Sequence, residues 1–164
     1  MIILGIDPGL ATVGWGVIST DGSRHRALAY GALTTPAGDS LDRRLCDIHT
    51  GITEIIKKWR PDAVPVEELF FNTNITTGIR VAEARGVILL CARQCGVSVC
   101  EYTPLQVKQA VVGYGRAEKK QVQEMTRQIL GLSAVPKPDD TADALALAVC
   151  HAHACNSAIH RAIK

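Results

Sequence analysis

Aromatic residues are scarce in this chain, at 4% of its 164 residues, whereas apolar residues make up 47%. Valine, isoleucine, leucine and alanine must therefore fill most of the core, and the length suits one domain. No apolar run is long enough for a transmembrane helix, and charged residues soon interrupt the apolar N-terminus, so we expect neither a membrane span nor a signal peptide. We therefore expect a single domain over residues 1–164 of a soluble, cytoplasmic protein.

The chain also lacks a strong excess of positive or negative residues, and it contains no C-x-x-C pair. Eighteen Lys and Arg residues against sixteen Asp and Glu give a net charge of +2, too mild to establish nucleic-acid binding, although a local basic patch remains compatible with it. The six cysteines do not have the spacing of a disulfide framework, and we interpret them as small buried apolar residues in a reducing compartment. The segment CHAHAC at 150–155 contains residue types that bind zinc. Its Cys–His pairs face different directions, however, and no second ligand group is evident, so we disfavour a zinc site.

Hydrophobic periodicity predicts an alternation of strands and helices. The expected strands cover 2–7, 13–20, 25–34, 62–67 and 97–102, with an Asp21-Gly22 hairpin turn between the second and third. The expected helices cover 40–59, 75–94, 105–112, 118–130 and 141–154. This order indicates an α/β fold, a mixed sheet with helices on both faces. Pro65 lacks a ladder donor, so we expect it at a strand start or in an edge position.

Four carboxylates have unusual positions. Asp7 and Glu67 each end an apolar strand, and the sites of open α/β sheets lie beyond such carboxyl ends. Asp140 and Asp143 are three residues apart at the start of the last expected helix, so both lie on one helical face. Taken singly, the strand-end acids are also compatible with solvated turn residues, and Asp140 with a helix N-cap. Asp143 is harder to explain structurally, because it interrupts an apolar stretch and would be a costly buried charge.

Clustered carboxylates raise one another's pKa unless a cation neutralises them. Hard divalent cations with oxygen ligands do so, and Mg²⁺ is the natural choice. Two such ions can activate a water and stabilise the leaving oxygen of a phosphodiester. The four acids therefore predict metal-assisted phosphodiester chemistry that needs no Cys or His.

The chain also resembles a known family in four ordered stretches. These are GIDPGLATVGWGVI, VEELFFNTNITTGIRVAEARGVILL, YTPLQVKQAVVGYGRAEKKQVQEM and PKPDDTADALALAVCHAH, and they resemble the RuvC Holliday junction resolvases over nearly the whole sequence. The resemblance implies a ribonuclease-H-like fold with a mixed five-stranded sheet, a homodimer, and Mg²⁺-dependent paired nicking of four-way DNA junctions in recombination and repair. It assigns catalysis and metal binding to Asp7, Glu67, Asp140 and Asp143, with two Mg²⁺ expected per subunit and Mn²⁺ as a substitute. Family members have His at the position of Asp140 in some cases.

The resemblance implies partners as well, namely the RuvA and RuvB branch-migration complex, and a preference for a short T-rich cleavage sequence. The expected helix at 75–94 is our candidate dimer interface, with Val87, Leu90 and Cys91 on one side. Glu68 is not a candidate acid, because adjacent strand residues point to opposite faces.

Aromatic and basic residues offer candidate DNA contacts. Both phenylalanines, Phe70 and Phe71, follow Glu67 and precede Asn74; one of them is expected in the core, and the resemblance points to Phe70 as a wedge or stacking platform. The basic candidates are Arg80, Lys108, Arg116, Lys119 and Lys120, with Arg85 as a weaker addition. Without the family resemblance, we would interpret most of this charge as a solvated helix surface. Gly113 and Gly115 instead favour a loop where backbone amides and cations approach phosphate.

Two other functions remain open at this point. The stretch DPGLATVGWG also resembles the phosphate loop of actin-like nucleotide-binding ATPases, although 164 residues are too few for two such lobes. A catalytically silent junction-binding module is the second alternative, and the intact set of four acids argues against it.

Overall fold

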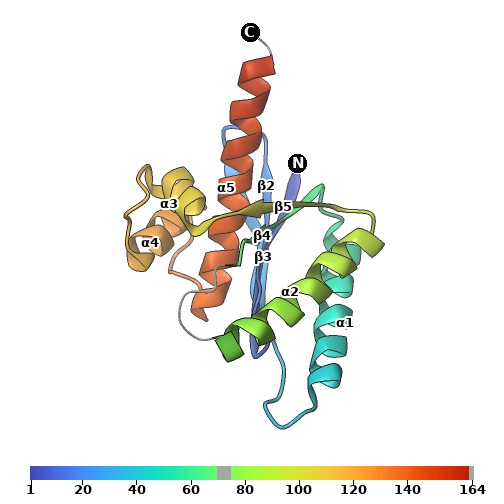
Figure 1. Cartoon of the computed structure of the whole chain (residues 1–164). Helices are drawn as coiled ribbons and strands as arrows, with labels where there is room; N and C mark the ends of the chain where they lie inside the picture. The colour runs from blue at the N-terminus through green and yellow to red at the C-terminus, as the bar shows by residue number, and fades with distance from the viewer. Residues whose placement is uncertain (70–74, 163–164) are drawn as a thin grey trace.

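The computed structural model describes residues 1–69 and 75–162, with residues 75–76 and 157–162 described by their backbone only. The strands are β1 (Ile2–Asp7), β2 (Thr12–Thr20), β3 (His25–Thr34), β4 (Ala63–Glu67) and β5 (Ser98–Tyr102). The helices are α1 (Leu41–Trp59), α2 (Ile75–Gln94), α3 (Pro104–Val112), α4 (Lys119–Ile129) and α5 (Asp139–Ala162) (Figure 1). The predicted order of strands and helices is confirmed, and the bounds differ by one or two residues except at the end of α5.

The strands form one five-stranded mixed sheet in the order β3-β2-β1-β4-β5. The first three strands pair antiparallel, and β4 is parallel to both β1 and β5. The predicted hairpin turn joins β2 to β3: the Asp21 carboxylate accepts hydrogen bonds from the backbone N–H groups of Ser23 and Arg24, and Gly22 has a φ of 104°. This topology puts the carboxyl ends of β1 and β4 side by side.

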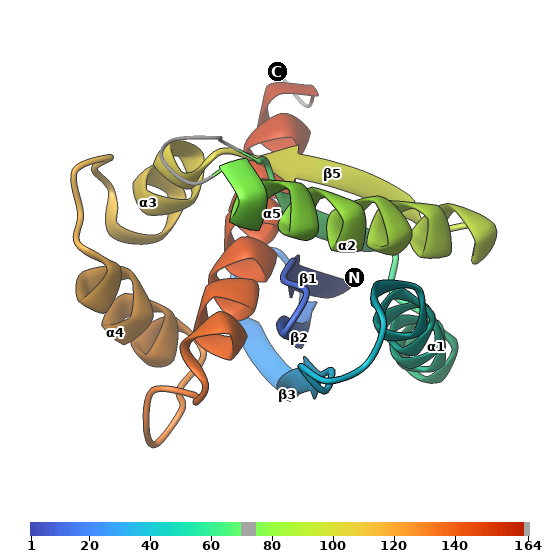
Figure 2. The ribbon, with the colours of Figure 1, turned by 60° about the horizontal axis from the view of Figure 1, so that its bottom comes forward.

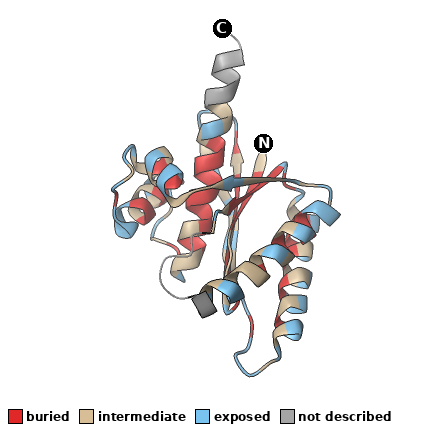
Figure 3. Cartoon of the chain, viewed as in Figure 1, coloured by how far each residue is buried: buried red, intermediate tan, exposed pale blue. Residues whose placement is uncertain are grey.

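Helices cover both faces of the sheet, as predicted (Figure 2). An apolar cluster between the sheet and helices α1 and α2 includes Leu4, Ile6, Val17, Ile48, Ile52, Val66 and Ile88. On the opposite face α5 packs on the sheet, and α3 and α4 pack against α5; the second cluster there includes Ile3, Ile18, Val107, Val122, Leu145 and Val149. The part of α5 that lies against the sheet is the most continuously buried segment of any helix (Figure 3). No helix in the described part of the chain is both long and apolar enough to cross a membrane.

Two strand glycines let the backbone of α5 come unusually close to the sheet. A Cβ added at Gly5 in β1 would lie 2.0 Å from the carbonyl oxygen of Ala144. A Cβ added at Gly14 in β2 would lie 2.0 Å from the carbonyl oxygen of Asp140. Real side chains do not fit at such distances, so only glycine permits this approach. The first turns of α5 are therefore held directly over the ends of β1 and β2.

Three sequence-based expectations were wrong. Pro65 lies in the middle of β4, between β1 and β5, and not at a strand start or an edge. The Glu68 N–H donates to the carbonyl of Tyr102 in β5, so the alternation of strand residues turns the nitrogen of Pro65 toward β1, where one ladder donor is missing. Cys91 does not share the exposed face of Leu90: it is fully buried, as our interpretation of the cysteines predicts, with its Sγ 3.0 Å from the hydroxyl of Thr53 in α1, whereas Cys46 is exposed and contradicts that interpretation.

Candidate active site

Two of the predicted acids meet because β1 and β4 are parallel neighbours. Ile6 pairs with Val66, which places Asp7 and Glu67 together at the carboxyl ends of the two strands. Ile6 and Val66 both belong to the cluster under α1 and α2. Since strand side chains alternate between faces, the two acids lie on the opposite face, toward α5.

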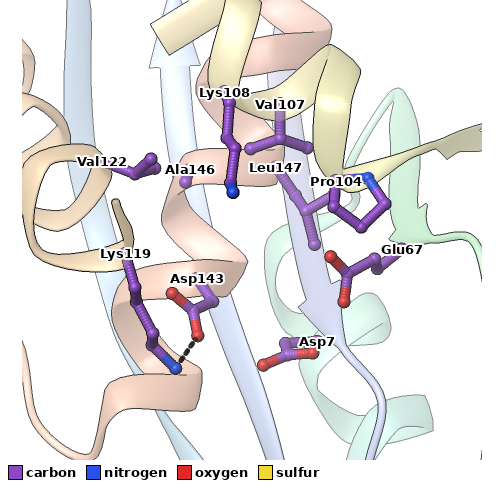
Figure 4. A pocket seen from close by; sticks show the side chains of 10 residues that line it. All are labelled: Asp7, Glu67, Pro104, Val107, Lys108, Lys119, Val122, Asp143, Ala146 and Leu147. Carbon is purple, nitrogen blue, oxygen red and sulfur yellow. Dashed lines mark ion pairs between the residues drawn. The ribbon is translucent and has the colours of Figure 1, made fainter. Parts of the chain in front are cut away.

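Helix α5 brings the other two acids to the same place. Asp140 and Asp143 lie in its first turns, which Gly5 and Gly14 hold against the sheet. Asp140 is the second residue of the helix, so the simpler interpretation of this residue as the N-cap does not hold. Asp143 faces the ends of β1 and β4 (Figure 4).

Three of the four acids line one cavity of about 260 Å³. The lining residues are Asp7, Glu67, Pro104, Val107, Lys108, Lys119, Val122, Asp143, Ala146 and Leu147. The carboxyl groups of Asp7, Glu67 and Asp143 surround a common space, with apolar side chains of α3, α4 and α5 along one wall (Figure 4). Glu68 is exposed and, like Asp140, is not among the described lining residues.

Two lysines complete the charged part of the cavity. The ammonium of Lys119, the first residue of α4, lies 2.7 Å from the Asp143 carboxylate. Lys108, on α3, points toward the acids from the other side (Figure 4). A reciprocal capping box between Thr103 and Gln106 fixes the start of α3, and at the start of α4 the Gln121 side chain accepts a hydrogen bond from the Glu118 N–H, so the backbone positions of both lysines are fixed.

Negative charge is in excess in this cavity. Burial raises the pKa of Asp7 to about 8, and the charges of Glu67, Asp143 and Asp140 add to the rise, while Lys119 opposes it. Burial and then Asp143 raise the pKa of Glu67 as well, again against Lys119. Burial would lower the pKa of Lys119, but the hydrogen bond and charge of Asp143 outweigh it, so this pKa is raised. One ammonium beside Asp143 therefore does not neutralise the acids, and a further cation would.

The donor set fits a hard divalent cation in its chemistry. Carboxylate oxygens are the ligands that Mg²⁺ prefers, and burial, followed by the neighbouring charges of Glu67, Asp143 and Asp140, raises the pKa of Asp7. In residues 1–69 and 75–162, however, no three His, Cys, Asp or Glu side chains converge closely enough to enclose a metal ion as they stand. The ammonium of Lys119 takes part of the space beside Asp143.

Besides Arg85, the remaining candidate residues fall into two groups. Phe70, Phe71 and Asn74 lie outside the described residues. Arg80, Arg116 and Lys120 are exposed, as expected for DNA contacts, which stay a prediction.

Arg85 does not belong to a free basic surface, contrary to our expectation. Its Nε donates to the backbone carbonyl of Glu67 at 3.1 Å, and its guanidinium pairs with the carboxylate of Glu101 in β5. Arg85 thus fastens the end of β4 that carries Glu67. Sequence reasoning missed this contact, because no pattern in the chain links positions 67, 85 and 101.

The family model and the most similar curated sequences point to the same protein family. The model of the family "Crossover junction endodeoxyribonuclease RuvC" matches residues 3–151. The chain is 62% identical to crossover junction endodeoxyribonuclease RuvC of Rubrobacter xylanophilus over 92% of this chain and 84% of that protein. It is 61% identical to the RuvC of Heliobacterium modesticaldum over 93% of this chain and 94% of that protein.

Solved structures agree with this result. The RuvC structure of Thermus thermophilus superimposes with a TM-score of 0.90 at 38% identity, covering 96% of this chain and 97% of that one. The structure of T. thermophilus RuvC in complex with Holliday junction substrate gives a TM-score of 0.88 at 37% identity, covering 96% of each chain. The yeast mitochondrial Holliday junction resolvase Ydc2, at 14% identity and a TM-score of 0.68, shares the fold, which is ribonuclease-H-like as predicted. The chain therefore belongs to the RuvC family of crossover junction endodeoxyribonucleases.

Proposed function

We propose that this chain is a Mg²⁺-dependent endonuclease that resolves four-way DNA junctions by paired, symmetric nicks during homologous recombination and DNA repair. The observation that carries the proposal is the cavity in which Asp7, Glu67 and Asp143 surround one space beside Lys108 and Lys119. Family membership supports the substrate, since a RuvC of 37% identity has been solved with a Holliday junction.

Asp7, Glu67 and Asp143, with Asp140 beside them, would hold the metal, for which Mn²⁺ is an expected substitute and two ions per subunit the expected number. A bound Mg²⁺ supplies a Lewis acid that lowers the pKa of a water and stabilises charge on the leaving oxygen. The carboxylates orient the attacking water and take its proton. The ammonium groups of Lys108 and Lys119 attract the phosphodiester, and the apolar wall of Val107, Val122 and Leu147 strengthens these charges by excluding water.

Hydrolysis by in-line attack breaks the P–O3′ bond, and the leaving 3′ oxygen takes a proton. The products carry 5′-phosphate and 3′-hydroxyl ends, which a ligase reseals. This chemistry suits recombination, because a resolved junction must yield intact duplexes.

Symmetric cutting of two strands calls for two active sites, so the protein is proposed to act as a homodimer. The face of α2 with Ile79 and Leu90, which are 50% and 53% exposed, is the proposed interface. Two large apolar side chains exposed on one helix favour such a contact. Of the three residues expected there, Leu90 remains, whereas Cys91 is buried and Val87 packs in part against the core. RuvA and RuvB are proposed as partners on the same junction, in the cytoplasm of a bacterial cell.

The DNA contacts are proposed in two groups. Lys108, Lys119, Arg116, Lys120 and Arg80 would supply phosphate contacts around the cavity. Phe70, Phe71 and Asn74 follow Glu67 within seven residues in the sequence, so we propose them for the strands that open at the junction centre.

A cleavage assay on a synthetic four-way junction tests the proposal, with and without Mg²⁺. We expect two symmetric nicks with the ion, none without it, and none in a linear duplex of the same sequence. Asp143→Asn should bind the junction but not cut it. Tight junction binding without any nicking in Mg²⁺ or Mn²⁺ would instead support the silent binding module.

A further inference from the structure

The ammonium of Lys119 lies between two carboxylates. It is 2.7 Å from Asp143 inside the cavity and 4.0 Å from Asp139 at the start of α5. Asp139 is also paired with Lys137, at 2.6 Å. Asp139 is not one of the four acids assigned above to catalysis or metal binding. Its contact with Lys119 nevertheless links it to Asp143.

Lys119 and a divalent cation would compete for Asp143. Both are cations, and like charges at ion-pair distance in a partly buried cavity repel strongly. An ion that engages Asp143 therefore displaces the ammonium. The backbone of Lys119 is held in place, because Lys119 starts α4 and the N–H of its neighbour Glu118 donates to the Gln121 side chain. Only the side-chain torsions of the lysine are free to change.

Asp139 offers the displaced ammonium a second partner within reach. Its carboxylate is half-exposed, so accepting the lysine requires little further desolvation. Its pairing with Lys137 restrains the carboxylate at this place. A short swing of the Lys119 side chain from Asp143 to Asp139 would leave the ammonium at the rim of the cavity.

We propose that Asp139 is a positioning residue that receives the ammonium of Lys119 when a divalent cation takes Asp143. Asp139 thereby eases entry of the ion and keeps the lysine at the cavity rim, where a phosphate arrives. This inference rests on the proposed metal-dependent function. It makes the exchange of partners by Lys119 a step that precedes cleavage.

Calorimetric titration of Mg²⁺ into the DNA-free protein tests the inference without reference to activity. Lys119→Met should tighten ion binding by roughly fivefold or more, at the lower end of typical coupling between two sites, because the competing cation is gone. Asp139→Asn should weaken binding by about two- to fivefold, the range for an exposed ion pair. In the Lys119→Met background, Asp139→Asn should change nothing. Asp39→Asn removes another partly exposed, ion-paired acid and is the matched control.

The double variant separates the possible outcomes. If Asp139→Asn weakens binding equally with and without Lys119, the residue acts through its own charge and the inference is overturned. It is overturned too if Asp139→Asn has no effect in the wild-type background. If neither the wild type nor Lys119→Met binds a divalent ion, the metal-dependent function fails, and the inference fails with it.

Discussion

Replacing Asp7 with Asn should stabilise the metal-free protein at high pH while abolishing cleavage. The pKa of Asp7 rises from 3.8 to about 8 in the folded chain. An acid with a raised folded-state pKa contributes its full stability below pH 3.8 and loses it as the pH rises through about 8. At 1.36 kcal/mol per unit, the ionised carboxylate at pH 9 destabilises the fold by roughly 6 kcal/mol at most. Water entry and rearrangement of the neighbouring acids reduce this ceiling.

Urea denaturation in EDTA at pH 4, 7 and 9 measures the effect. We expect Asp7→Asn and wild type to have similar free energies of unfolding near pH 4. At pH 9 the variant should be more stable by at least about 1 kcal/mol, a shift readily seen in the urea midpoint. Mg²⁺ should stabilise the wild type and have little effect on the variant.

Single-turnover cleavage and gel-shift binding complete the test. Junction binding should survive the change, and cleavage should fall by orders of magnitude at any Mg²⁺ concentration, since each 1.36 kcal/mol of lost transition-state stabilisation is about tenfold in rate. An Asp7→Asn protein with wild-type stability at pH 9 would refute the electrostatic argument. One that cuts like the wild type would refute the site.

Three further changes test separate parts of the structure. Leu90→Glu should convert the proposed dimer to a monomer by light scattering and abolish paired nicking, and a variant that stays dimeric would move the interface elsewhere. Lys108→Ala should weaken binding to all junction sequences alike and lower the salt slope by about one, whereas a loss confined to one sequence would indicate base readout. Arg85→Met frees the carbonyl of Glu67, and we expect single-turnover cleavage to fall by about tenfold at unchanged junction affinity; an equal loss of affinity would place Arg85 on the DNA instead.

Local patterns sufficed to predict the order of the fold. The helical spacing of Ile48, Ile52 and Ile55 gave α1, because an amphipathic helix buries one stripe. The Asp21-Gly22 pair gave the hairpin, because few residues suit its backbone. The positions of Asp7 and Glu67 followed from two strands that end on an acid. In each case the signal lies within a few residues of the feature that it predicts.

Features that depend on distant neighbours were not predictable in this way. The outward or inward direction of Cys91 depends on how α2 rests on α1, which periodicity in α2 alone does not resolve. A proline in an interior strand contradicts local preference and is tolerated by the surrounding ladder. The basic run at 116–120 is typical of a solvated surface, yet one of its members turns into the acidic cavity. The packing of α4 beside α5 determines that Lys119 is the basic residue that reaches Asp143.

The glycines beneath α5 fix the distance between this helix and the sheet, and with it the spacing of the acids in the cavity. Gly5 and Gly14 meet the helix backbone to backbone, so no rotatable side chain separates Asp143 from the strand that carries Asp7. Side chains in a core change rotamer and tolerate exchange, whereas such a seam has no adjustable part. Exchanges of side chains elsewhere in the core around α5 therefore do not change the spacing of the acids, provided that positions 5 and 14 carry no side chain.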